Sequence, residues 1–159
     1  MTAGSIYYAV QSGHYVLKCV GDVRLTLCSS LDCHLESVTE GQELIDILID
    51  LTEAEGVDST TLGLIAKLAV KAAKLGLPKP ALVSTNDDIT RVLYSMGFDC
   101  VFMLMDELPV SACDLKALPW VVESDEKVRG RIVAAHEVLM DLNEANREAF
   151  QDLIKALEH

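Results

Sequence analysis

The central part of the chain alternates between short apolar runs and helix-like segments, and this alternation restricts the folds that the chain can adopt. The segments are, in order, a strand over 44–51, a helix over 60–75, a strand over 81–84, a helix over 85–96 and a strand over 100–105. Strands that alternate with helices are joined by right-handed crossovers and lie parallel in one sheet. The sequence therefore predicts an α/β fold.

The first part of the chain adds two strands and a helix to this plan. Residues 6–10 and 14–20 are rich in β-formers and flank the turn-forming pair Ser12-Gly13. Residues 25–37 carry leucines four positions apart, which indicates an amphipathic helix. We expect a mixed, mostly parallel sheet packed with helices over residues 1–106, followed by a C-terminal helical extension.

The charge of the chain excludes several classes of partner. Of its 159 residues, 25 are acidic and 13 are basic, so the formal net charge is −12. Nucleic acids and anionic membrane surfaces repel such a chain. The sequence has no signal-peptide pattern, and Lys67, Lys71 and Lys74 interrupt its best candidate for a membrane span. We expect a cytoplasmic protein that binds neither nucleic acid nor membrane.

The cysteines indicate reduced thiols rather than a disulfide framework. They are odd in number and scattered, at Cys19, Cys28, Cys33, Cys100 and Cys113. Cys28, Cys33 and His34 lie close together but do not match the ligand spacing of a zinc site. We expect no metal and no cofactor.

The C-terminal third has a different pattern. Residues 107–123 contain two prolines and are expected to form a connecting loop with a short helix near 112–117. In residues 124–157, mostly apolar residues recur at alternating steps of four and three, as along the heptad seam of one long helix. The seam comprises Val128, Ile132, Ala135, Leu139, Leu142, Asn146, Ala149, Leu153 and Ala156.

Such a helix can fold back onto the domain, form a dimer seam or bind a partner, and the sequence leaves these three roles open. We expect a monomer or a weak homodimer. The last three residues, Leu157-Glu158-His159, resemble the start of a vector-encoded histidine tag, so Glu158 and His159 carry no functional interpretation.

Three consecutive hydroxyl residues stand where a strand is expected to meet a helix. They belong to the hexapeptide Asp58-Ser59-Thr60-Thr61-Leu62-Gly63. The N-terminus of a helix favours an anion, because its first N–H groups are free and the helix dipole is positive there. Phosphorylation of one hydroxyl would add about −1.5 to −2 charges at this point. The alternative is that one hydroxyl only caps the helix.

We expect no enzymatic activity. Nucleophilic hydrolysis needs an activated serine or cysteine with a base. The chain has no G-x-S-x-G elbow, and none of its histidines stands at a spacing that ties it to Ser59. His136 lies beside the seam and is expected at the surface or in packing. Neither a P-loop nor a G-x-G-x-x-G motif occurs.

A stripe of lysines follows the hydroxyl cluster. Thr60, Lys67, Lys71 and Lys74 fall on one face of the expected helix. On an acidic protein, such a stripe could meet an acidic partner. The alternative is an ordinary solvated helix face.

Three separated segments together resemble the STAS-domain anti-anti-sigma factors, over roughly residues 5–105. Gly21-Asp22-Val23, followed by Leu27 and Leu31, is similar to the segment that leads into the first helix of that family. The hexapeptide is similar to the family's phosphorylation motif, Asp-Ser-Ser/Thr-Gly-Leu-Gly. The segments similar to the family's last helix and strand are Arg91-Val92-Leu93, Gly97-Phe98 and Val101-Phe102. Thr61 stands where the family has glycine.

The resemblance implies a phosphorylation cycle. A serine kinase phosphorylates Ser59, with Thr60 and Thr61 as secondary candidates, and a PP2C-like phosphatase reverses the reaction. The unmodified form binds an anti-sigma factor and thereby frees a sigma factor. The partner-binding residues that the resemblance and the lysine stripe suggest are Asp22, Asp58, Ser59, Thr60, Thr61, Gly63, Lys67 and Lys71.

In length and helical tail the chain is most similar to the HsbA-type subgroup of these proteins. That subgroup implies outputs to a flagellar anti-sigma factor and a diguanylate cyclase, and hence to motility and biofilm genes. The alternative function is a constitutive STAS scaffold, in which Ser59 is only a cap and the C-terminal helix binds the partners.

Overall fold

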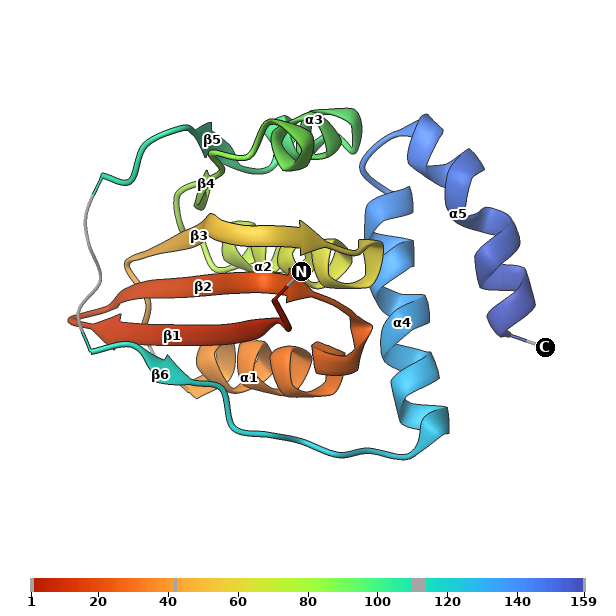
Figure 1. The fold of residues 1–159 in the computed structure, drawn as a ribbon, viewed down its shortest axis with the longest axis horizontal. Coiled ribbons are helices and arrows are strands. Elements are labelled where there is room, and N and C mark those ends of the chain that lie inside the picture. The colour runs from red at the N-terminus through yellow and green to blue at the C-terminus, as the bar shows by residue number, and fades with distance from the viewer. Residues whose placement is uncertain (1, 42, 110–113, 159) are drawn as a thin grey trace.

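Six strands form one sheet in the computed structural model, which describes residues 2–41, 43–109 and 114–158 (Figure 1). The strands are β1 (Ser5–Gln11), β2 (His14–Val23), β3 (Asp46–Val57), β4 (Ala81–Val83), β5 (Met103–Met105) and β6 (Lys116–Ala117). Their order across the sheet is β5-β4-β3-β2-β1-β6. Strands β2 to β5 pair in parallel, and β1 pairs antiparallel with both β2 and β6. The predicted mixed, mostly parallel sheet is therefore confirmed.

Helices connect the parallel strands and cover the sheet (Figure 1). They are α1 (Cys28–Gly41), α2 (Ser59–Lys74), α3 (Asp87–Ser95), α4 (Asp125–Met140) and α5 (Glu144–Leu157), with short 3-10 turns η1 (Leu25–Leu27) and η2 (Phe98–Cys100). Along β2, the alternate residues Tyr15, Leu17 and Cys19 are fully buried, whereas their neighbours are partly exposed. The helices therefore seal one face of this strand, as the two-residue period of a half-buried strand requires.

A buried histidine joins α1 to the sheet. The Tyr15 hydroxyl lies 2.9 Å from Nε2 of His34, and the ring of Tyr8 lies 4.2 Å from the imidazole, centroid to centroid. Burial lowers the pKa of His34 to about 4, because an imidazolium would lose its hydration there. Burial also raises the pKa of Tyr15, which keeps the phenol protonated. A neutral phenol and a neutral imidazole therefore share this hydrogen bond.

Several boundaries differ from those predicted. β3 runs on to Val57 instead of ending at residue 51, because its pairing with β2 continues as far as Val23. The expected strand over 100–105 is shorter, since η2 occupies its start and β5 begins at Met103. Of the short helix expected near 112–117, residues 112 and 113 lie outside the described residues. Residues 116–117 instead form β6, which pairs with the edge of β1.

The C-terminal extension consists of two helices rather than one continuous helix, so the single-helix prediction is wrong. α4 ends at Met140, and the side chain of Asn143 caps α5 by accepting from the Asn146 N–H at 2.8 Å. The buried Asn146 amide in turn donates to the carbonyls of Met96 and Leu139. These bonds fix a sharp turn over 141–143 and hold it against the end of α3.

The turn changes which side chains of the seam face the domain. Ala135 and Leu139 of α4 are fully buried, whereas Ala149 and Leu153 of α5 are exposed. α4 crosses the edge of the molecule at which β2 and β3 end, and α5 lies on its outer side (Figure 1). Of the three roles left open for the tail, folding back onto the domain is the one that this structure displays.

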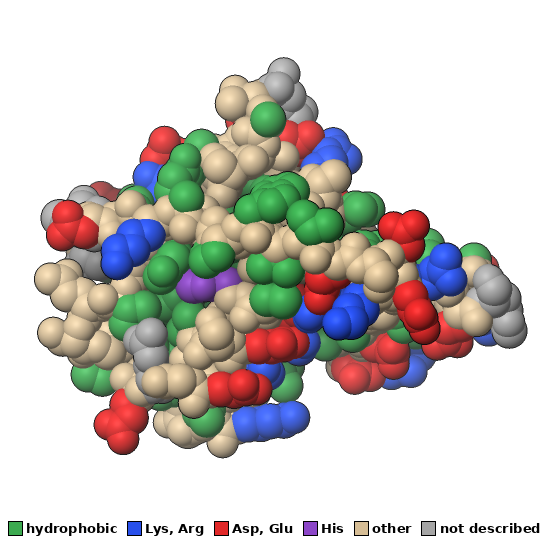
Figure 2. Space-filling model, turned by 90° about the horizontal axis from the view of Figure 1, so that it is seen from below, with side chains coloured by type: hydrophobic (Ala, Val, Ile, Leu, Met, Phe, Trp, Pro, Cys, Tyr) green, Lys and Arg blue, Asp and Glu red, His purple; other side chains and the backbone are tan. Residues whose placement is uncertain are grey.

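On the side of β6, the residues that the structure describes form no broad field of one charge. Seen from that side, acidic and basic side chains alternate over the helical region, with apolar side chains between them (Figure 2). None of the helices within the described ranges combines the length and the hydropathy needed to cross a membrane.

Replacing His34 with Gln should reduce the amount by which the free energy of unfolding falls as the pH is lowered. The folded chain holds the pKa of His34 near 4, below its usual 6.5, so the unfolded chain takes up the proton first as the pH falls. Stability linked to His34 is complete above pH 6.5 and is lost as the pH falls towards 4. Urea unfolding on both sides of this window measures the effect. Equal losses in the wild type and His34→Gln would contradict this account.

Candidate functional site

Asp58 fixes the start of α2. It is the extended N-cap residue of the helix, and its Oδ1 accepts from the Thr61 N–H at 2.9 Å. Its Oδ2 accepts from the Leu25 N–H at 2.7 Å, so the same carboxylate ties α2 to the segment that follows β2. The Asp58 N–H donates to the carbonyl of Val23. The cap is therefore Asp58 rather than one of the three hydroxyls that follow it.

The three hydroxyl residues occupy different environments. Thr60 and Thr61 are 3% and 1% exposed, so both are buried in the first turn of α2. Ser59 is partly exposed. In this conformation Ser59 is the one of the three whose side chain reaches the surface.

Ser59 contacts a histidine from the C-terminal extension. Its Oγ lies 2.8 Å from Nε2 of His136, and Nδ1 of the same ring lies 2.8 Å from the carbonyl of Ile132. A carbonyl only accepts, so Nδ1 carries the hydrogen and, in the neutral ring, Nε2 accepts from the serine. His136 is 1% exposed and packs edge-on against Phe150. Sequence reasoning did not connect this histidine with Ser59.

Gly63 allows α4 to approach α2 closely, one turn after Ser59. A Cβ atom at this position would lie 2.3 Å from the carbonyl oxygen and 2.8 Å from the Cβ of Ala135. Both distances are shorter than non-bonded atoms tolerate, so no residue with a side chain fits here without moving one helix. The backbones of α2 and α4 are therefore in direct contact.

A cluster of charges joins α1, α2 and α4. Nη1 of Arg131 lies 2.7 Å from Oδ2 of Asp32, and Nζ of Lys67 lies 3.1 Å from Oδ1 of the same carboxylate. Nε and Nη2 of Arg131 lie 2.6 and 2.8 Å from the two carboxylate oxygens of Glu123. The Asp32 side chain is 3% exposed, and these two cations are its ion-pair partners.

The charge cluster shifts the pKa values of its members. The hydrogen bonds from Arg131, together with one from Ser29, lower the pKa of Glu123 to about 2. The same bond to Glu123 raises the pKa of the Arg131 guanidinium. Both side chains therefore stay charged over the whole physiological range of pH, and a fixed ion pair anchors the start of α4.

The lysine stripe is only partly free to meet a partner. Lys67 pairs with Asp32 and lies 3.9 Å from Glu36, so it neutralises acids of the same chain. Lys71 is half-buried and Lys74 is exposed. Thr60, which the helical period placed on the same face, is buried. The stripe is therefore shorter than the sequence predicted.

The other predicted partner-binding residues gather at one end of the sheet. Asp22 accepts from Nε of Arg24 at 2.7 Å and lies beside Gly56 in the pairing of β2 with β3. Asp58 and Ser59 follow at the end of β3.

The packing of α4 against α2 had one local signal in the sequence, which is Gly63. A glycine inside a helix commonly marks a close contact with another element.

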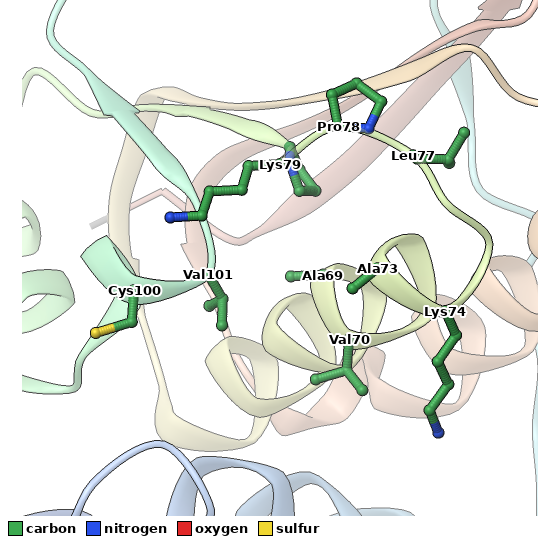
Figure 3. A pocket seen from close by; sticks show the side chains of 10 residues that line it. Ala69, Val70, Ala73, Lys74, Leu77, Pro78, Lys79, Cys100 and Val101 are labelled. Carbon is green, nitrogen blue, oxygen red and sulfur yellow. The ribbon is translucent and has the colours of Figure 1, made fainter.

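An apolar cavity of about 330 Å³ lies at the other end of α2 (Figure 3). It opens between the last turns of that helix and the segment around Cys100 and Val101, with Lys74 and Lys79 among its lining residues. A second cavity of similar size lies between β4, β5 and α3. Neither is lined by Ser59 or His136, and the described residues contain no group of three side chains suited to a metal ion.

Gly63→Ala should lower the free energy of unfolding. The new methyl group meets backbone atoms of α4, and overpacking of this kind costs about 1–3 kcal/mol, against roughly 1 kcal/mol gained in helix propensity. Gly130→Ala is the matched control. Gly130 lies in α4 with nothing within 4 Å of a new Cβ, so the same change should stabilise the chain. Urea unfolding compares the two, and equal effects would argue against the helix contact.

Known proteins share the fold of this chain. Residues 5–111 match the STAS domain family. An anti-sigma factor antagonist from Mycobacterium paratuberculosis has a similar structure, with a TM-score of 0.56, 20% identity, and coverage of 67% of this chain and 88% of that one. A proposed anti-sigma factor antagonist from Thermotoga maritima also has a TM-score of 0.56 and 20% identity, and the similarity covers 64% of this chain and 86% of that one. None of the curated proteins matches the chain.

At this level of identity, the two structures show a shared fold alone. The family match itself spans β1 to β5 and contains all three segments whose resemblance was noted in the sequence. It ends before α4 and α5 begin. The protein therefore belongs to the STAS domain family, as those segments predicted.

Proposed function

We propose that this protein is a phosphorylation-switched anti-anti-sigma factor. In this function the unmodified form binds an anti-sigma factor and frees a sigma factor, and phosphorylation of Ser59 changes the choice of partner. The observation that carries the proposal is the placement of Ser59. It follows the Asp58 cap at the start of α2, at the family's motif position, and is partly exposed while Thr60 and Thr61 are buried. The names of the two similar structures support the same reading.

A phosphate on Ser59 has a physical basis for acting as a switch. The positive end of the α2 dipole favours an anion there. The added charge also stands beside the Asp58 carboxylate in a chain whose net charge is already −12. A partner surface fitted to a neutral hydroxyl would meet an unpaired buried charge, at a cost of several kcal/mol. Since about 1.4 kcal/mol is tenfold in affinity, no change of fold is needed.

The resemblance to the HsbA-type subgroup suggests the wider circuit. A serine kinase and a PP2C-like phosphatase would set the phosphorylation state in the cytoplasm. The outputs would be a flagellar anti-sigma factor and a diguanylate cyclase, which connect the switch to motility and biofilm genes. We propose a monomer or a weak homodimer as the working form.

We further propose that the protein has no catalytic activity of its own. The contact between Ser59 and His136 has the separation of a nucleophile and its base. The imidazole is 1% exposed, however, and Ser59 lines neither of the two cavities described above. We interpret the contact as part of the interface between α2 and α4.

Ser59→Ala should abolish phosphate incorporation while the chain still captures the anti-sigma factor. Ser59→Asp should reduce that capture at least tenfold, because it places a charge against a partner surface that fits a neutral hydroxyl. Affinity purification of tagged variants from the native host, with the captured proteins and the phosphosite identified by mass spectrometry, measures both effects.

Ser95→Ala and Ser95→Asp provide the matched controls. Ser95 is an exposed serine at the end of α3, so neither change should alter phosphate incorporation or capture. Phosphate found on another residue, together with equal capture by Ser59→Ala and Ser59→Asp, would rule out the proposed switch.

A further inference from the structure

We propose that α4 occupies, within the chain, the surface on which a partner helix binds. The partner helix would present a basic residue, a small residue and a large aliphatic residue at successive four-residue steps. In α4 these positions are held by Arg131, Ala135 and Leu139. The inference rests on the proposed function, because it takes the Ser59 face of α2 as the partner surface.

The surface beneath α4 requires a small residue on its partner. Gly63 brings the carbonyl oxygen of Ala135 to 2.3 Å from where a Cβ would stand, so the two backbones touch. A larger side chain at position 135 would hold the helices apart. Any helix that replaces α4 at this depth meets the same restriction.

The same surface requires a basic residue one turn earlier. Asp32 is buried and is bound by both Arg131 and Lys67, and Glu36 lies 3.3 Å from Arg131. Without α4, two carboxylates remain beside one lysine, so the exposed patch carries net negative charge. A partner with a cation at this position restores the pairing, and a partner without one leaves a carboxylate poorly compensated.

An aliphatic residue one turn later would complete the match. Leu139 is fully buried in the same cluster as Leu62 and Ala66 of α2. Departure of α4 therefore exposes apolar surface on α2, which favours its return or its replacement by a similar helix.

Two observations indicate that α4 can be displaced. The Ser59 oxygen shares its hydrogen with His136, and a phosphoryl group on that oxygen takes the place of the hydrogen. Phosphorylation therefore breaks the observed hydrogen bond, in which the serine donates. The surface under α4 then serves the partner of the phosphorylated form, not the anti-sigma factor that the unmodified form captures. In addition, α4 lies beyond residues 5–111, the segment that matches the STAS family, so the family fold is complete without it.

The test uses a peptide in place of the unidentified partner. A fluorescent peptide of residues 124–142 is titrated against the full-length wild type, Arg131→Glu and Arg129→Glu chains, with fluorescence anisotropy as the readout. Arg131→Glu sets an acid against Asp32 and should open the extension. Arg129→Glu makes the same charge change at an exposed position of α4 and should not. The peptide should bind the Arg131→Glu chain at least tenfold more tightly than the other two.

Variant peptides test the chemistry of the surface. On the opened chain, Arg131→Ala or Ala135→Leu in the peptide should weaken binding at least tenfold, whereas Arg129→Ala should leave it unchanged. Equal binding of all the peptides, or no binding to an opened chain, would overturn the proposal.

Hydrogen exchange establishes whether the chain has opened. The amides of α4 should lose protection in Arg131→Glu while those of β2 and β3 keep it, which shows that the domain stays folded. If neither Arg131→Glu nor a chain with Ala135→Leu loses protection in α4, the helix is a fixed part of the fold and the proposal fails.

None of these readouts involves phosphate, so the two proposals can fail separately. If the peptide binds but Ser59→Ala and Ser59→Asp capture the anti-sigma factor equally well, only the proposed function is overturned. A working Ser59 switch without peptide binding would overturn only the role assigned to α4.

Discussion

The backbone contact between Gly63 and Ala135 determines how the last third of the chain lies on the domain. Because no side chain separates α2 from α4 at this point, the two helices meet at a single register. That register brings His136, the residue after Ala135, onto Ser59, and Arg131, one turn before it, onto Asp32. The polar contacts of the interface are consequences of one small residue in the middle of a helix.

These polar contacts make the interface specific as well as stable. Asp32 is a buried carboxylate with two cations around it, and His136 is a buried imidazole with both nitrogens bound. A buried group of this kind is compensated in one arrangement and loses its partners in a shifted one. A purely apolar contact would let α4 slide along α2. This interface instead favours two states, in which α4 is either docked in this one register or undocked.

The sequence predicted the features that depend on local pattern. The alternation of strands and helices and the strand-to-helix junction before Ser59 are both predicted by the pattern of residues that are neighbours in the sequence. The contact between Ser59 and His136 spans 77 positions and leaves no periodic trace. The turn over 141–143 was hidden because Leu142 and Asn146 continue the heptad spacing, although Asn146 binds backbone carbonyls instead of lining a seam. β6 is two residues long and forms only because β1 offers an edge.

The segment that leads to α4 also determines how tightly another helix must bind to replace α4 on α2. Residues 118–124 connect β6 to α4 and are pinned along the way, by the Leu118 N–H on Ile6 and the Val121 N–H on Ser30. A ligand held on so short a tether has an effective concentration in roughly the millimolar range. A competitor present at micromolar levels must therefore bind the same face about a thousandfold more tightly, about 4 kcal/mol, to displace half of it. The connecting segment thus acts as a concentration threshold, and weak encounters with other helices leave α4 in place.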